Sequence, residues 1–127
     1  MAGDLEKKVR DFFRLLDAKY FDGWTRAASD DIQSVDELSR RWMRGRGAFQ
    51  DYFKQFGPQL SDIHSTLSDV RETVWGDAGM VTCWLEQDYT YQGKKQHVSA
   101  PTTAVLRRTG SEWKLALFHS IPLPENA

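Results

Sequence analysis

Four segments in the second half of the chain are rich in Val, Thr, Trp, Tyr and Leu, with polar residues between the apolar ones. Short turns separate these segments, and each turn contains glycine. This pattern is typical of antiparallel strands joined by hairpins. We therefore predict a four-strand meander, with strands over about Ile63–Val74, Met80–Thr90, Gln96–Arg108 and Glu112–Ser120.

Apolar residues at helical spacing predict two main helices in the first half of the chain. The face of the first helix consists of Leu5, Val9, Phe12, Phe13, Leu16 and Tyr20. Asp22-Gly23 ends this helix, and Trp24–Ala28 adds one or two further helical turns. The face of the second main helix consists of Phe49, Tyr52, Phe53 and Phe56. Gly57-Pro58 ends it, because proline cannot continue a helix.

A weaker pattern between the helices predicts a short hairpin, with strands at Ile32–Val35 and Arg40–Met43. Runs of helices followed by runs of strands are typical of α+β proteins. We predict a single domain over residues 1–127. Its curved antiparallel sheet combines the meander with the short hairpin, and about three N-terminal helices cover the concave face.

If each hairpin is symmetric about the middle of its turn, the residues that pair across neighbouring strands can be predicted. Paired residues point to the same face of the sheet, so the pairing also predicts which side chains share a face. This symmetry pairs Tyr89 with His97, and Pro101 with His119. One face then carries all three histidines together with Val81, Cys83, Leu85, Gln87, Tyr89, Ser99, Thr103 and Leu117. The other face carries Leu67, Met80, Trp84, Glu86, Asp88, Val98, Leu106 and Phe118. A monomer would leave the apolar part of this second face in water, so we predict a homodimer through it.

Composition excludes several classes of function. A formal net charge of −1 argues against a general nucleic-acid-binding protein, which would carry a basic excess. No apolar run approaches the roughly 20 residues of a membrane span. The single cysteine, Cys83, excludes an internal disulfide and fits a reducing compartment, so a cytoplasmic location is expected. The local basic cluster is predicted to be a solvated surface, with an anion site as the alternative; it consists of Arg40, Arg41, Arg44 and Arg46.

Three segments carry a resemblance to a known family. Leu16–Trp24 reads LDAKYFDGW, Arg44–Phe49 reads RGRGAF, and Thr103–Ser120 contains TAVLRR followed by FHS. Together they resemble the SnoaL-like proteins of the nuclear transport factor superfamily, which have a cystatin-type α+β cone. The third segment is similar to the closing hairpin of the calmodulin-kinase association domain branch.

This resemblance implies a cone with a pocket between the concave face of the sheet and the helices, and a homodimer through the convex face. Family members include isomerases, cyclases, dehydratases and hydrolases of small hydrophobic molecules, and also oligomerisation modules without catalysis. Fold alone therefore does not decide the function. Relatives often have arginine where this chain has Pro101, so anion recognition at that position is not carried over.

His119 is the first candidate for a catalytic role, because it lies at the mouth end of the meander and matches the family's histidine. A core histidine with a hydrogen-bonded neighbour is the alternative. Asp31, in the turn after the helices, is the candidate carboxylate for proton abstraction beside a carbonyl, with turn capping as the alternative. Neither a metal nor a cofactor is expected, since the histidines lack close ligand spacing. The predicted pocket lining is Tyr20, Trp42, Gln87, Tyr89, His97, Ser99, Thr103 and Leu117.

Two functions of different classes follow from the sequence. The first is a small-molecule-binding protein. Its enzymatic form would be a cofactor-independent isomerase, cyclase or dehydratase that acts on a small apolar carbonyl compound. The second is a homodimerisation or association module without catalysis, which the apolar second face and the lack of an evident acid–base pair favour.

Overall fold

The structure, a computed structural model, describes residues 3–124, so the ends of the predicted 1–127 domain lie outside it. No helix within this range is both long and apolar enough to cross a bilayer. The helices are α1 (Asp4–Asp17), α2 (Phe21–Arg26), α3 (Arg46–Phe56) and the 3₁₀ turn η1 (Gly57–Gln59). The strands are β1 (Ala28–Asp36), β2 (Met43–Arg44), β3 (Leu60–Trp75), β4 (Ala78–Tyr91), β5 (Lys94–Thr109) and β6 (Glu112–Ser120).

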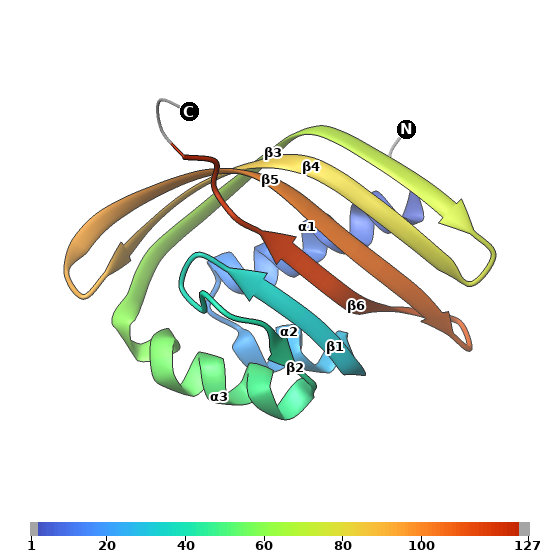
Figure 1. The fold of residues 1–127 in the computed structure, drawn as a ribbon, viewed down its shortest axis with the longest axis horizontal. Helices are drawn as coiled ribbons and strands as arrows, with labels where there is room; N and C mark the ends of the chain where they lie inside the picture. Colours follow the sequence, from blue (N-terminus) through green and yellow to red (C-terminus); the bar gives the residue numbers. More distant parts are fainter. Residues whose placement is uncertain (1–2, 125–127) are drawn as a thin grey trace.

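The strands form one six-stranded sheet in the order β2-β1-β6-β5-β4-β3. Figure 1 shows the sheet arching over α1 and α3, so that the helices lie on its concave side. The predicted α+β class, with a four-strand meander and a short hairpin, is confirmed. The hairpin joins the meander through a parallel pairing of β1 with β6, for example Ser34 with Phe118, which the sequence did not indicate.

Aromatic side chains fill the space between the helices and the sheet. Trp24 lies at the centre, with ring centroids 4.8 Å from Phe49 and 5.6 Å from Phe118. The predicted helix stripe is confirmed for its first four positions, which are buried: Leu5, Val9, Phe12 and Phe13. Close approach of α1 to β4 favours glycine at Gly79, because a Cβ there would overlap the end of the buried Leu5 side chain, which would have to move.

The turn between β4 and β5 is shorter than predicted and reverses the predicted faces of β5 and of the end of β6, from Leu117 onward. A register shift opposite Val105 and Leu106 keeps Leu115 on the core side, as predicted. It has two residues, Gln92 and Gly93, both with positive φ, as in the type I′ turns favoured by hairpins. Tyr89 therefore pairs with Gln96, and His97 pairs with Asp88. A shift of one residue turns every side chain beyond it to the opposite face. The predicted sharing of one face by the histidines and Tyr89 is wrong, and three residues predicted on the outer face are buried in the core: Val98, Leu106 and Phe118.

Two β-bulges in β3 change its alternation as well. Each bulge sets two β3 residues opposite one β4 residue, between Ser61 and His64 and between Ser68 and Arg71. Asp62 and Asp69, with φ of 53° and 50°, occupy the left-handed conformation in these bulges. The bulges let Ile63, Leu67 and Val70 all face the core. The predicted placement of Leu67 on the outer face, and of His64 on the inner face, is therefore wrong.

The conformation of Asp69 predicts an unusual effect of glycine in a strand. Replacing Asp69 by glycine is expected to raise the free energy of unfolding by about 0.5 kcal/mol, because glycine adopts positive φ without steric cost. The matched change Ser68→Gly, at the last regular pair before the bulge, is expected to lower it by about 0.5–1 kcal/mol. Urea denaturation of both variants measures the difference, and the opposite order would contradict the bulge conformation.

Candidate functional site

A largely apolar cavity lies between the concave face of the sheet and α3. The cavity has a volume of about 50 Å³, or about 540 Å³ when the open solvent at its mouth is counted. It is therefore comparable to the space of a few water molecules. The lining comes from nearly every element: Leu16, Trp24, Ser34, Asp36, Glu37, Leu38, Met43, Phe49, Tyr52, Phe53, Leu60, Ile63, Gln87, Tyr89 and Phe118.

The end of β1 and the loop after it supply the carboxylates of the cavity. Asp36 accepts hydrogen bonds from the backbone N–H groups of Leu38 and Ser39, at 3.0 and 2.8 Å. Its other oxygen accepts a bond of 2.7 Å from the Tyr52 hydroxyl on α3. These bonds fix the loop to α3 and so place Glu37 in the wall of the cavity.

Glu37 has an environment that favours the neutral acid. Burial, assisted by the nearby negative charge of Asp36, raises the pKa of the Glu37 carboxyl to about 7. The Tyr89 hydroxyl donates a hydrogen bond of 3.2 Å to it, and burial raises the pKa of Tyr89 as well. The pKa of Tyr52 is raised for the same reason. At neutral pH the two tyrosines are therefore donors, while Glu37 can both give and accept a proton.

Two further polar groups lie in the cavity wall. The Gln87 side chain donates a 2.9 Å bond to the Ser65 hydroxyl, which in turn donates a 2.7 Å bond to Asp17. This chain of bonds holds Gln87 against β3. The indole Nε1 of Trp24 is buried and has no hydrogen-bond partner among the described residues. An unpaired buried donor is uncommon in folded proteins.

Comparison with known proteins connects this geometry to a family. The model of the SnoaL-like domain matches residues 6–124, which is nearly the whole chain. The chain belongs to the SnoaL-like family. No curated protein shows a significant match to it.

Solved structures agree with this domain on the fold. The CaMKII hub of S. rosetta is 18% identical, with a TM-score of 0.79 and coverage of 97% of this chain and 99% of the hub. An NTF2-like protein with a cystatin-like fold from Novosphingobium aromaticivorans is 15% identical, with a TM-score of 0.77 and coverage of 98% and 82%. A ketosteroid isomerase-like protein from Erwinia carotovora is 13% identical, with a TM-score of 0.79 and coverage of 94% and 93%. At these identities the likeness concerns the fold alone.

The cavity of this SnoaL-like domain contains only some of the residues predicted to line the pocket. Gln87 and Tyr89 lie in its wall. The shortened β4–β5 turn moves the predicted residues of β5 and β6 to the other face of the sheet: His97, Ser99, Thr103, Leu117 and His119. His119, the predicted catalytic histidine, is the direct partner of Thr103 there and does not line the cavity.

The remaining predicted residues lie at three separate places. Asp31 is exposed on β1, where it accepts bonds from the Ser29 hydroxyl at 2.9 Å and from Arg107 at 3.2 Å. These interactions, that of Ser29 first, lower the pKa of Asp31. Tyr20 is 48% exposed and hydrogen-bonded to Arg26, and Trp42 is 42% exposed. None of the three lines the cavity.

Sequence reasoning missed the acidic part of the cavity wall. The predicted hairpin places Asp36 and Glu37 in its turn, and helical spacing assigns Tyr52 to the apolar face of α3. One signal was present, since the pair of acids is flanked by the apolar residues Val35 and Leu38. Within residues 3–124, no group of three or more His, Cys, Asp or Glu side chains is arranged to hold a metal ion.

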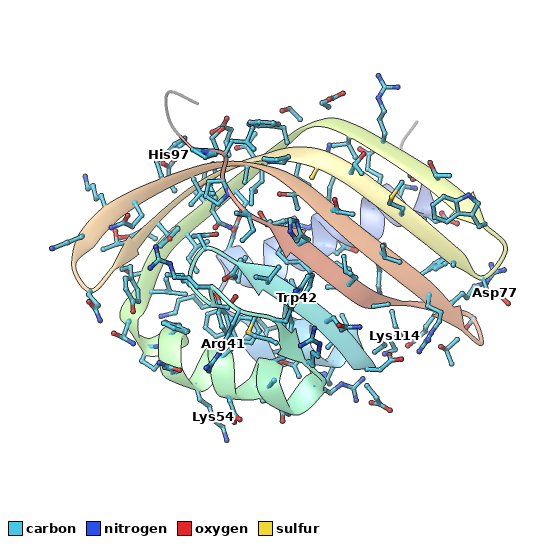
Figure 2. All side chains as sticks on the ribbon, in the orientation of Figure 1. Arg41, Trp42, Lys54, Asp77, His97 and Lys114 are labelled. Atoms are coloured by element: carbon cyan, nitrogen blue, oxygen red, sulfur yellow. The ribbon has the colours of Figure 1, made fainter. Side chains whose placement is uncertain are left out.

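A second polar cluster lies on the convex face, centred on His97. Its two ring nitrogens lie 2.7 Å from Asp88 and 2.8 Å from Glu86. Glu86 also accepts a 2.8 Å bond from the Ser99 hydroxyl. Figure 2 shows His97 on the side of the sheet opposite Lys54, which belongs to α3. The bond with Asp88, and next the bond with Glu86, raises the pKa of His97.

The raised pKa of His97 predicts a pH-dependent contribution to stability. A raised pKa stabilises the folded state fully below the pKa of the unfolded chain, about 6.5, and this contribution is lost as the pH rises through the folded-state pKa. The variant His97→Gln is therefore expected to be less stable than the parent at pH 5.5 and to approach it at pH 9. Thermal denaturation at both pH values measures this. Because the cluster is exposed, the difference should shrink in 1 M NaCl, and a larger gap at pH 9 than at pH 5.5 would contradict the ion pairing.

Proposed function

We propose that this SnoaL-like protein binds a small apolar carbonyl compound in the cavity and transfers a proton on it with Glu37. The observation that carries the proposal is a carboxyl group with a pKa of about 7 in a largely apolar cavity. General acid–base catalysis is most effective when the pKa of the catalytic group lies near the working pH. A cofactor-independent isomerase or lyase needs a group of this kind.

The roles of the residues follow from their contacts. Ionised Glu37 removes a proton from the carbon beside the carbonyl, and the resulting acid returns the proton to another carbon of the same molecule. Tyr89 donates its hydrogen bond to the Glu37 carboxyl and so orients it. In this proposal the Nε1–H of Trp24, a residue of the cavity wall whose N–H has no partner among the described residues, donates to the carbonyl oxygen, where negative charge develops. Glu37 is the residue that transfers the proton, the role expected from the sequence for His119 and Asp31.

Isomerisation of 3-cyclohexenone to the conjugated 2-cyclohexenone is a direct test, because the substrate is a small apolar ketone and the product absorbs in the ultraviolet. The parent protein is expected to catalyse it, and Glu37→Gln to reduce kcat by about 10²–10⁴-fold. Glu112→Gln, a change of an exposed carboxylate on β6, is the matched control and should leave the rate unchanged. A rate insensitive to Glu37→Gln would overturn the assignment.

A second measurement does not depend on the substrate. Carbon-detected NMR of the side-chain carboxyls should show Glu37 titrating near pH 7. Titration of Glu37 near 4.5, the ordinary value for glutamate, would remove the basis of the proposal.

A self-association function is the second candidate, and a feature of the convex face favours it. None of the helices within residues 3–124 covers this face, and it carries apolar side chains that are partly exposed: Met80, Trp84, Val105 and Leu117. Hub and association domains are among the structural neighbours. A homodimer through this face is expected to sediment as one species of twice the chain mass at micromolar concentration. A monomer under those conditions would exclude this function.

A further inference from the structure

A second depression lies outside the cavity, between α3 and the loop that joins β1 to β2. We call it the outer groove. Its volume is about 520 Å³, which is within the range of small-molecule sites. Met43 and Tyr52 line both the outer groove and the cavity, so these two side chains form the wall between them. The complete lining is Ser39, Arg41, Trp42, Met43, Ala48, Asp51, Tyr52, Gln55 and Phe56.

The outer groove has aromatic walls that are already held in place. Trp42 on the loop is 42% exposed, and its ring centroid lies 5.9 Å from the guanidinium of Arg44 and 6.1 Å from the tilted ring of His119. On α3, Tyr52 is fixed by its bond to Asp36, and its ring lies 5.1 Å from that of Phe56. Pre-ordered aromatic surfaces bind a flat apolar group at low entropic cost.

The charges of the outer groove differ between its two walls. Arg41, on the loop wall, is exposed and forms no ion pair within residues 3–124. Figure 2 labels Arg41 next to Trp42 on this loop. The neighbouring arginines are engaged elsewhere, Arg44 with Gln33 and Arg46 with Asp30. The acid of the lining, Asp51, belongs to α3, so an anion is attracted to the loop wall and repelled from the helix wall.

We propose that the outer groove is a binding site for aromatic carboxylates. The ring of the ligand stacks on Trp42, and its carboxylate accepts two hydrogen bonds from the guanidinium of Arg41, a geometry that arginine is suited to provide. Neither residue lines the cavity of Glu37. The proposal therefore stands or falls independently of the proton-transfer function.

Titration of the ¹⁵N-labelled protein with phenylacetate tests this site. We expect the largest shifts in the indole N–H of Trp42 and in the backbone amides of Ala48–Phe56. Phenylacetamide, a neutral compound of nearly the same shape, is expected to bind at least tenfold more weakly, because charge-assisted bonds to arginine are lost. Shifts that map to Gln87 and Tyr89 in the cavity, or equal binding of acid and amide, would overturn the proposal.

Three variants separate the contributions. Arg41→Gln is expected to weaken phenylacetate binding by tenfold or more, and Trp42→Leu to weaken both phenylacetate and phenylacetamide. Arg14→Gln, on α1 and away from the outer groove, is the matched control and should leave the affinity unchanged. Glu37→Gln should also leave it unchanged. An affinity that does not respond to Arg41→Gln would exclude the assigned ion pair.

Discussion

Replacing Glu37 by glutamine is expected to raise the free energy of unfolding by about 3 kcal/mol above pH 8 and to leave it nearly unchanged at pH 4. The pKa of this carboxyl is about 7 in the folded protein, against 4.5 as its ordinary value. Each pKa unit corresponds to about 1.4 kcal/mol. Glutamine keeps the size and an oxygen that can accept the bond from Tyr89, but it carries no charge to bury.

The sign of this pH dependence is opposite to that of a carboxylate in an ion pair. Below pH 4 Glu37 is protonated in both the folded and the unfolded state, so it carries no charge whose burial would lower the free energy of unfolding. Between the two pKa values the unfolded chain has lost the proton and the folded protein keeps it, so stability falls as the pH rises. Above pH 7 both states are ionised and the full penalty remains.

Urea denaturation at pH 4, 6 and 8.5 measures this effect. Glu112→Gln is the matched control, because a hydrogen bond from Lys114 lowers the pKa of Glu112 and its removal offers no gain at high pH. A Glu37→Gln variant that is no more stable than the parent at pH 8.5 would show that Glu37 is solvated.

Replacing Trp24 by alanine is expected to lower the free energy of unfolding by about 3–5 kcal/mol, the usual cost of deleting a large core aromatic. Trp24 is 3% exposed and its ring contacts side chains from both helix and sheet layers, including Phe12 and Phe118. Trp24→Phe should cost clearly less, because it keeps an aromatic ring and removes an N–H without a partner.

Trp75 provides the matched control for this prediction. It is 57% exposed at the end of β3, so Trp75→Ala is expected to change the stability by no more than about 0.5 kcal/mol. Chemical denaturation of the three variants gives the comparison. Equal losses for Trp24→Ala and Trp75→Ala would contradict the central position of Trp24 in the core.

The features that the sequence predicted correctly are those with a local pattern. The stripe of α1 and the ends of α3 follow from helical spacing and from Gly57-Pro58, and the meander follows from its glycine turns. The faces of β5 could not be predicted securely, because a difference of a few residues in turn length decides them. The preference of Gln92-Gly93 for a two-residue turn was the missed signal.

The acid–base part of the candidate site could not be read from the sequence for a different reason. Glu37 differs from an ordinary turn glutamate only through its burial, which depends on segments far apart in the chain, such as Leu60 and Phe118. The parallel pairing of β1 with β6 places the loop of Glu37 at the cavity, and it joins residues more than 80 positions apart, for example Ser34 and Phe118. Local periodicity contains no information on such a pairing.

The two bulges of β3 have a consequence for solubility. β3 and β2 are the outermost strands of the sheet, and a free strand edge is a template for pairing with another chain. β2 has only two residues, which is too short to recruit a new strand, whereas β3 has sixteen. The left-handed residues Asp62 and Asp69 interrupt the regular edge of β3 and add charge there, which protects this long strand against edge-to-edge aggregation.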